Sequence, residues 1–425
     1  MRRFSLVFVL LAALAGGLEA TVVKITVAAP IHPITSEYIV QAIKDADAEG
    51  ARLVLLVLDT PGGLDTSMRE IISAIVNART PVAAYVAPSG ARAASAGIYI
   101  GVACDIFAMA PGTSTGAAHP VSIGLGGQAP DKTMEDKVTN DAVAYIKTLA
   151  EKRGRNLRLA EDAVRKSLSY TEQEALRGGL INLVAATESD LLAKLDGSSI
   201  RRFDGRTEVL ELQGQPLVER PMTFRQKFLL TISNPNLAYL LLMLGLLGLY
   251  FEFANPGAIL PGVLGGISLL LAIFSFQILP INYVGLLLIL FALALFAIEI
   301  KVHSYGLLSL GGITAMVIGS LMLVKAPIPE LRPGLRFIIP VALGVSLIIV
   351  FLVTLVVRAQ ARRAMTGREG LAGEAGRALE DFDGTGKVLV HGEVWEAETD
   401  VPLRRGEAVR VVQVGEGLKL RVTKA

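Results

Sequence analysis

The stretch ARLVLLVLDTPGG, residues 51–63, decides the fold of the first half of the chain. Its apolar run is short, starts beside a charged residue and ends in Asp59 and a Pro-Gly-Gly turn. Such a run is typical of a strand buried on both faces of a parallel sheet. Gly62 and Gly63 at its end leave backbone N–H groups able to approach a ligand closely, although the same residues also make a plain strand-to-helix turn. Asp59 is expected to cap that turn.

The residues around this strand continue the same pattern. A second buried run, TPVAAYVA, occupies residues 80–87. Apolar residues at helical spacing fall between and after these strands, over Ser36–Glu49, Ser67–Asn77, Met134–Lys152 and Leu159–Lys166. Strands that alternate with helices predict an α/β domain, which we place at residues 21–230.

A serine lies in a second motif, PSGARAASAGIYI, residues 88–100. Ser95 stands among small residues where a strand gives way to a helix. A serine at a helix N-terminus is well placed as a nucleophile, because the helix dipole favours a developing anion and the next N–H can donate to an oxyanion. The spacing is close to that of a nucleophile elbow with Ala93 in place of the first glycine. Close packing of a small-residue helix is the alternative.

The hydrophobicity of the chain is concentrated in one region. The chain has 425 residues, of which 52% are hydrophobic and 19% charged. Residues 236–357 contain only seven charged residues. Apolar runs long enough to span a bilayer lie at about 237–254, 259–279, 282–300, 305–324 and 336–357. This predicts a transmembrane domain of about five helices, or four if the second run is re-entrant.

The N-terminus has the layout of a secretory signal. In residues 1–20, Arg2 and Arg3 precede a short apolar run that is followed by small residues. Cleavage is expected after Gly17 or Ala20, and an uncleaved N-terminal anchor is the alternative. With a cleaved signal and five spans, the first domain is expected outside the cytoplasm.

The C-terminal tail returns to soluble character. Four arginines follow the last apolar run, namely Arg358, Arg362, Arg363 and Arg368, and predict a cytoplasmic side for the tail. Residues 366–425 hold short alternating runs with Gly-rich turns, which predict a small all-β barrel of OB-like size. This segment contains 9 basic and 11 acidic residues and a lone tryptophan, Trp395, so nucleic-acid binding is not expected. Interaction or assembly is the expected role.

Several chemistries are not expected. Cys104 is the lone cysteine, which excludes an intramolecular disulfide, a Cys-ligated zinc site and an iron–sulfur cluster. The four histidines show no ligand spacing, and there is no Gly-rich phosphate loop, so neither a metal nor another cofactor is predicted.

The motifs together resemble one family. LDTPGG, SGARAASAGIYI, MAPGTSTGAAHPV, DKVTNDAVAYIKTLAEKRGRN and SYTEQEALRGGLIN are similar, in this order, to the long form of nodulation-efficiency protein D (NfeD), membrane-bound serine proteases of the ClpP/crotonase superfamily. The resemblance covers most of the chain and is strongest over Val54–Leu183. It implies a ClpP/crotonase-like α/β domain, then a multi-span α-helical membrane domain, then the OB-like barrel.

The resemblance also implies site residues. Ser95 is the nucleophile, and the oxyanion hole is formed by the N–H of Gly62 or Gly63 and of Ala96. Lys137, 42 positions after Ser95, matches the lysine that this family pairs with its serine. To act as a base the lysine must be neutral, which requires an apolar pocket that a substrate helps to seal.

The rival base is His119, which lies near the position where ClpP peptidases place their histidine. A Ser–His pair needs an orienting acid, and the segment around Lys166 and Ser167 offers none. Asp162 is the nearest acid upstream. Residues 122–131, between Ser95 and Lys137, are predicted to be a mobile loop that covers a site completed only when substrate binds.

The resemblance implies hydrophobic peptide substrates, in particular the C-terminal apolar segment of stomatin-like membrane proteins, and a homo-oligomer. A second hypothesis is a membrane scaffold or assembly partner of stomatin-like proteins with weak or vestigial peptidase activity. A crotonase-like acyl-CoA enzyme is a third, disfavoured by the signal sequence, because coenzyme A is cytosolic.

Overall fold

A computed structural model describes most of the chain. The described residues are 21–121, 132–254, 259–277, 281–302, 304–325, 332–360, 368–415 and 419–425, together with Gly257, Leu279 and Gly417. The predicted signal at 1–20 and the predicted loop at 122–131 lie outside them.

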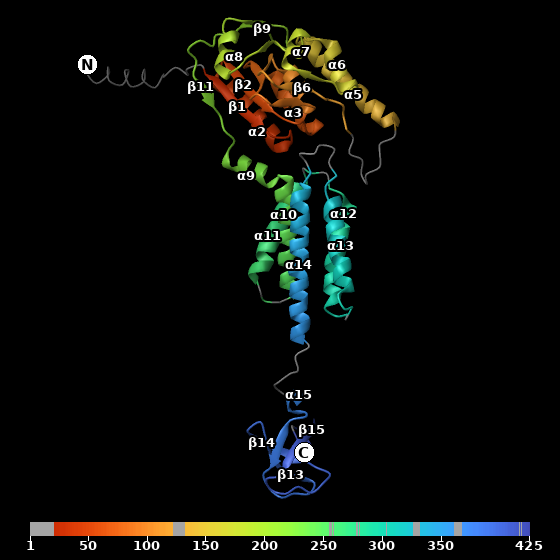
Figure 1. The fold of residues 1–425 in the computed structure, drawn as a ribbon. Helices are drawn as coiled ribbons and strands as arrows, with labels where there is room; N and C mark the ends of the chain where they lie inside the picture. Colours follow the sequence, from red (N-terminus) through yellow and green to blue (C-terminus); the bar gives the residue numbers. More distant parts are fainter. Residues whose placement is uncertain are drawn as a thin grey trace, which may run out of the picture. The chain divides into compact units, whose positions relative to one another are not determined.

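The first domain is built on a parallel sheet (Figure 1). Six strands pair in the order β11-β1-β2-β3-β5-β8. Their bounds are β1 Val22–Ala28, β2 Leu53–Asp59, β3 Val82–Val86, β5 Ile106–Met109, β8 Leu183–Val184 and β11 Leu217–Glu219. The stretch 51–63 supplies β2, in which every residue except Asp59 is buried. Two separate buried clusters pack on this sheet, as expected for strands covered on both faces.

Helices alternate with the strands. They are α2 Pro33–Glu49, α3 Asp65–Asn77, α4 Ala96–Ala103, α5 Lys132–Lys152, α6 Leu157–Arg165, α7 Glu172–Arg177 and α8 Glu188–Leu195. The four predicted helical segments correspond to α2, α3, α5 and α6, each starting two or three residues earlier than the pattern suggested. The α/β prediction is therefore confirmed.

A second, smaller sheet lies beside the end of β2. It consists of β4 Arg92–Ala94, β6 Ser114–Gly116 and β7 Ser169–Thr171, with β4 and β6 parallel. An isolated bridge between Thr60 and Ala93 connects it to the PGG turn. The sequence pattern predicted a strand before Ser95, which is β4, but it did not predict β6 or β7, because three residues are too few to show an alternation. A hairpin of β9 Ser199–Arg201 and β10 Thr207–Val209 completes the domain.

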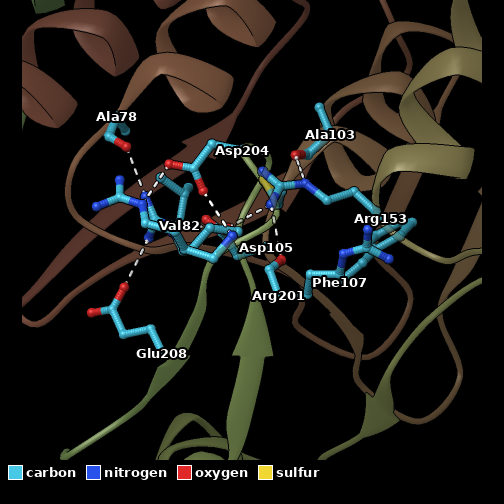
Figure 2. A network of polar contacts seen from close by, with 12 residues as sticks. Ala78, Val82, Ala103, Asp105, Phe107, Arg153, Arg201, Asp204 and Glu208 are labelled. Carbon is cyan, nitrogen blue, oxygen red and sulfur yellow. Dashed lines mark hydrogen bonds and ion pairs between the residues drawn. The ribbon is translucent and has the colours of Figure 1, made fainter.

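Buried charged side chains connect the C-terminal end of α5 to the sheet (Figure 2). Asp105 precedes β5, and its carboxylate accepts hydrogen bonds from the Val82 N–H at 2.9 Å and from Arg153 Nη1 at 2.6 Å. The Asp105 and Arg153 side chains are each 1% exposed. Arg202 Nε, next to β9, lies 3.5 Å from the same carboxylate. Three chain segments therefore meet at one buried acid.

Within the described residues, five helices lie in the predicted membrane region. They are α10 Pro235–Ala254, α11 Ile259–Phe276, α12 Tyr283–Glu299, α13 Leu307–Met322 and α14 Leu335–Gln360, and a short helix α9 Phe224–Ile232 precedes them. Among the described residues, α10, α11 and α14 are long and apolar enough to cross a membrane, whereas α12 and α13 are shorter apolar helices. The number of spans stays a prediction.

These helices include two hairpins. In the first, Gly248 of α10 packs directly against Gly265 of α11. In the second, Gly285 of α12 packs against Gly319 of α13. Small residues let membrane helices approach closely.

The C-terminal segment forms a closed barrel, as predicted. Its strands are β12 Ala375–Ala378, β13 Thr385–Val390, β14 Glu393–Glu398, β15 Ala408–Val414 and β16 Leu420–Lys424, in the order β12-β13-β14-β16-β15. The turn α15 Arg368–Leu371 precedes them. Trp395 is partly buried and packs against the barrel core.

Candidate active site

Ser95 lies between β4 and the first residue of α4, and its backbone is strained. Its φ of 52° and ψ of −115° are outside the conformations that a serine ordinarily adopts. Neighbouring strands hold it there, because the Ser95 N–H donates to the Gly116 carbonyl at 2.8 Å. Strain of this kind persists only when the surroundings enforce it, and it clusters at functional sites. The predicted nucleophile therefore has the backbone of a nucleophile elbow.

Gly62 lies directly against Ser95. Its φ is +114°, and a Cβ built on it would fall 2.5 Å from Ser95 Cβ and 3.0 Å from Ser95 Oγ. No residue with a side chain fits there without moving the serine. The Gly62 N–H donates to Thr60 Oγ1 at 3.2 Å, so this amide already has an acceptor.

Gly63 and Ala96 offer the better oxyanion donors. Gly63 forms a bridge with Ile31 that uses the Gly62 carbonyl and the Leu64 N–H, so the Gly63 N–H lies outside the ladder. A Cβ on Gly63 would fall 1.9 Å from the Ile31 carbonyl oxygen. The Ala96 N–H is the first of α4, where a helix supplies no acceptor of its own.

His32 holds the other side of the PGG turn. It caps α2, with Nδ1 accepting from the Ile34 N–H at 3.2 Å. Burial lowers the pKa of His32 to about 4, so the ring is neutral and can accept this bond at neutral pH. The cap fixes the chain next to Ile31 and thereby the glycine turn.

The helix α5 is clamped beside the serine helix. Arg69 of α3 donates to Asp141 of α5 at 2.6 Å, and its guanidinium lies 4.3 Å from the centre of the Tyr145 ring. Tyr145 stacks on Tyr99 of α4, one turn beyond Ser95, with ring centres 6.2 Å apart. The clamp joins the elements that carry the predicted nucleophile and the predicted base, and sequence spacing gave no signal for Arg69.

Lys137 lies on α5 one turn before Asp141 and is exposed. Within the described residues no hydrogen bond joins Ser95 and Lys137. The structure therefore places Ser95 at the start of α4 and Lys137 on the adjacent helix α5, without a hydrogen bond that pairs them. The apolar pocket expected around the lysine is not formed by the described residues.

His119 has an acid neighbour that sequence reasoning missed. Its Nε2 lies 3.9 Å from Glu135 Oε1, and its Nδ1 is 3.1 Å from the Val164 carbonyl. Sequence position does not indicate Glu135 as the acid partner, because it precedes Lys137 on α5 rather than lying near Lys166. Asp162, the acid that the sequence suggested, pairs instead with Lys166 at 3.0 Å. The histidine contacts the helix of the lysine rather than Ser95.

Asp59 has a structural role. Its Oδ1 accepts from the Arg92 N–H at 3.1 Å, which joins the end of β2 to the start of β4. Across the described residues, no group of three or more His, Cys, Asp or Glu side chains is arranged to hold a metal ion.

Three family models match successive parts of the chain. A model described as the NfeD1b N-terminal domain matches residues 21–204, one described as the NfeD integral membrane domain matches 236–355, and one described as the NfeD-like C-terminal, partner-binding domain matches 368–424. A curated relative, the membrane-bound protease PH1510 of Pyrococcus horikoshii, is 35% identical over 391 residues, covering 89% of this chain and 88% of the relative. The chain belongs to the NfeD family. The sequence-based resemblance is thereby confirmed.

Other relatives cover less of this NfeD chain. Membrane protein NfeD1b of Bacillus subtilis is 29% identical over 303 residues, which are 70% of this chain and 66% of the relative. A solved structure described as the 1510-N membrane protease specific for a stomatin homolog from Pyrococcus horikoshii is 33% identical, with a TM-score of 0.44, over 50% of this chain and 98% of its own. A variant of 1510-N in complex with a substrate peptide is 34% identical, with a TM-score of 0.47, over 50% and 98%. With its family and its three long apolar helices, this NfeD chain is a membrane protein.

Proposed function

We propose that this NfeD chain is a membrane-anchored serine endopeptidase with a Ser95–Lys137 dyad. One observation carries the proposal: Ser95 has a strained backbone against Gly62, beside two N–H groups that neither the bridge nor the helix uses. The homologous Pyrococcus protein is named a membrane-bound protease, which supports the same chemistry.

In this proposal the reaction uses the Ser95 hydroxyl, the Lys137 amine and the two N–H groups. Ser95 Oγ attacks the scissile carbonyl carbon while the neutral Lys137 amine takes the hydroxyl proton. The Gly63 and Ala96 N–H groups stabilise the oxyanion, each such donor contributing roughly 3–4 kcal/mol in known hydrolases. The C–N bond then breaks, the lysine returns its proton to the leaving amine, and water hydrolyses the acyl-enzyme.

Substrate binding completes the dyad in this proposal. Lys137 is exposed and unbonded to Ser95, whereas a lysine base must be desolvated. A hydrophobic substrate bound across Ser95 and Lys137 supplies the missing apolar cover. Since the 1510-N protease is described as specific for a stomatin homolog, we propose the apolar C-terminal segment of a stomatin-like protein as substrate.

The protease domain is proposed to lie outside the cytoplasm and the barrel inside. Support comes from the signal-like residues 1–20 and from the arginines after the last apolar run. The superfamily resemblance supports a homo-oligomer.

The test uses the full-length protein in detergent and synthetic apolar peptides with the sequences of stomatin C-termini. Ser95→Ala and Lys137→Ala are expected to abolish cleavage, whereas His119→Ala retains part of it. Full activity in Lys137→Ala together with loss in His119→Ala would refute the dyad.

A scaffold function is the second candidate. The observation that favours it is the closed C-terminal barrel, which matches a model described as partner-binding. Such a scaffold would hold stomatin-like partners in the membrane. Unchanged partner binding and full cellular function in a Ser95→Ala strain would favour the scaffold over the enzyme.

A further inference from the structure

The short helix before the membrane helices carries an exposed aromatic pair. Thr223 starts α9 with a capping box that includes Gln226. Phe224 is 85% exposed and Phe228 is 44% exposed. As residues i and i+4 they lie on one side of the helix. Two exposed phenylalanines on nine residues form an apolar surface that water does not favour.

The rest of α9 is fixed by contacts. Gln226 and Ile232 are buried. The Ile232 carbonyl accepts a hydrogen bond of 2.7 Å from Ser275 Oγ, near the end of α11. Arg225 forms an ion pair with Glu37 of α2. These contacts fix the rotation of α9 about its axis. The side that carries Phe224 and Phe228 therefore stays exposed.

The position of α9 in the chain indicates what covers that side. Only two residues separate it from α10, whose apolar window begins at Pro235, and the α11 window ends at Phe276, next to Ser275. The end of α9 therefore lies where the apolar window of α10 begins and that of α11 ends, and it is hydrogen-bonded to Ser275 there. Phenylalanines on the apolar face of a helix at this level are buried about 5–10 Å into the boundary between headgroups and acyl chains. The exposed Lys227 between the phenylalanines can extend its ammonium group to the lipid phosphates.

We infer that α9 lies in the membrane interface, with Phe224 and Phe228 inserted among the lipid headgroups. It is a membrane contact additional to the spanning helices. It joins the protease domain to the bilayer surface directly before the first span. The bilayer is the occupant because α9 ends two residues before α10 and its Ile232 carbonyl is bonded to Ser275, at the end of the apolar helix α11.

Spin labels test this placement in the full-length chain, reconstituted in phosphatidylcholine vesicles. Cys104 is buried and burial raises the pKa of its thiol to about 12, so it leaves a new surface cysteine as the reactive one. Phe224→Cys and Phe228→Cys receive a nitroxide. Val209→Cys is the matched control, because Val209 is 58% exposed on β10, outside α9.

The expected result is an accessibility contrast. At positions 224 and 228 dissolved oxygen relaxes the nitroxide more than a water-soluble nickel complex does, by roughly threefold for a label about 5–10 Å into the interface. At position 209 the nickel complex dominates. The inference is overturned if both α9 labels match position 209, or if both are inaccessible to either reagent, as in a contact with protein. This readout is independent of peptide cleavage, so it stands or falls separately from the proposed enzyme.

Discussion

Replacing Asp105 by Asn tests whether the buried charges hold α5 on the sheet. Asparagine keeps the shape of the side chain but removes its charge. Arg153 then remains buried, at 1% exposure, without a counter-ion. Breaking a buried ion pair in this way costs about 3–5 kcal/mol, because the remaining charge is uncompensated.

Cys104 gives a direct assay of that cost. It is the lone cysteine of the chain, it is adjacent to Asp105, and it is fully buried. A thiol reagent therefore modifies it only when this part of the domain opens. A loss of about 3–5 kcal/mol raises the labelling rate roughly a hundred- to several-thousand-fold, at tenfold per 1.4 kcal/mol. The measurement is made on the full-length protein in detergent. The membrane helices contain no cysteine, so they do not contribute to the labelling signal.

Two further variants test whether the change in labelling rate comes from the loss of the buried Asp105–Arg153 ion pair. Asp204→Asn removes the ion pair with Arg206 at 2.6 Å, which is at the surface, and is expected to leave the labelling rate unchanged. Adding Arg153→Met to Asp105→Asn is expected to recover part of the loss, because a buried cation is removed. A labelling rate in Asp105→Asn within about threefold of the parent would show that this acid does not stabilise the domain as a buried ion-pair partner.

Three other outcomes are expected. Gly62→Ala places a methyl group 2.5 Å from Ser95 Cβ and should lower kcat for peptide cleavage by about 10²-fold or more; cleavage at the parent rate would contradict the close contact. Arg69→Met removes the α3–α5 clamp and should lower kcat by about tenfold or more with little change in the thermal midpoint, whereas an unchanged kcat would remove the clamp from the site. His32 has a folded-state pKa of about 4 against an ordinary 6.5, so between these values the unfolded chain binds the extra proton and stability falls as the pH drops. His32→Asn should flatten that part of the pH profile of the unfolding midpoint, and a parallel profile would count against the assignment.

The sequence was sufficient for the elements with a long periodic pattern. The run before Asp59 is a buried strand, and the pattern over Met134–Lys152 is the helix α5. Each of these signals comes from many buried residues, on both faces of the strand and along one side of the helix, so a few mismatches do not change the prediction. The Gly-rich alternating runs of the tail gave the closed barrel for the same reason.

The contacts that define the site left no comparable pattern. The strand β4, which presents Ser95, has three residues and is fixed by pairing with β6, about 20 positions later in the chain. Glu135 beside His119 and Asp141 beside Arg69 are ordinary charged positions on an exposed helix until the fold brings partners to them. These partners are brought together by pairing between distant parts of the chain, which the spacing of residues along the sequence does not reveal.

The proposed nucleophile and the proposed base differ in the contacts that hold them. Ser95 is fixed by the Gly116 carbonyl, by the helix that follows it and by the glycine beneath it. Lys137 is exposed on the first half of α5, where nearby Glu135 lies 3.9 Å from His119. The Arg69 clamp and the buried pair of Arg153 hold the helix at Asp141 and just past its end. In the proposed mechanism the groups around Ser95 are therefore already positioned before substrate arrives, whereas Lys137 is not yet bonded to the serine. In that mechanism peptides are hydrolysed slowly until a bound apolar segment excludes water from the Lys137 amine, so activity is expected to depend on the hydrophobicity of the substrate.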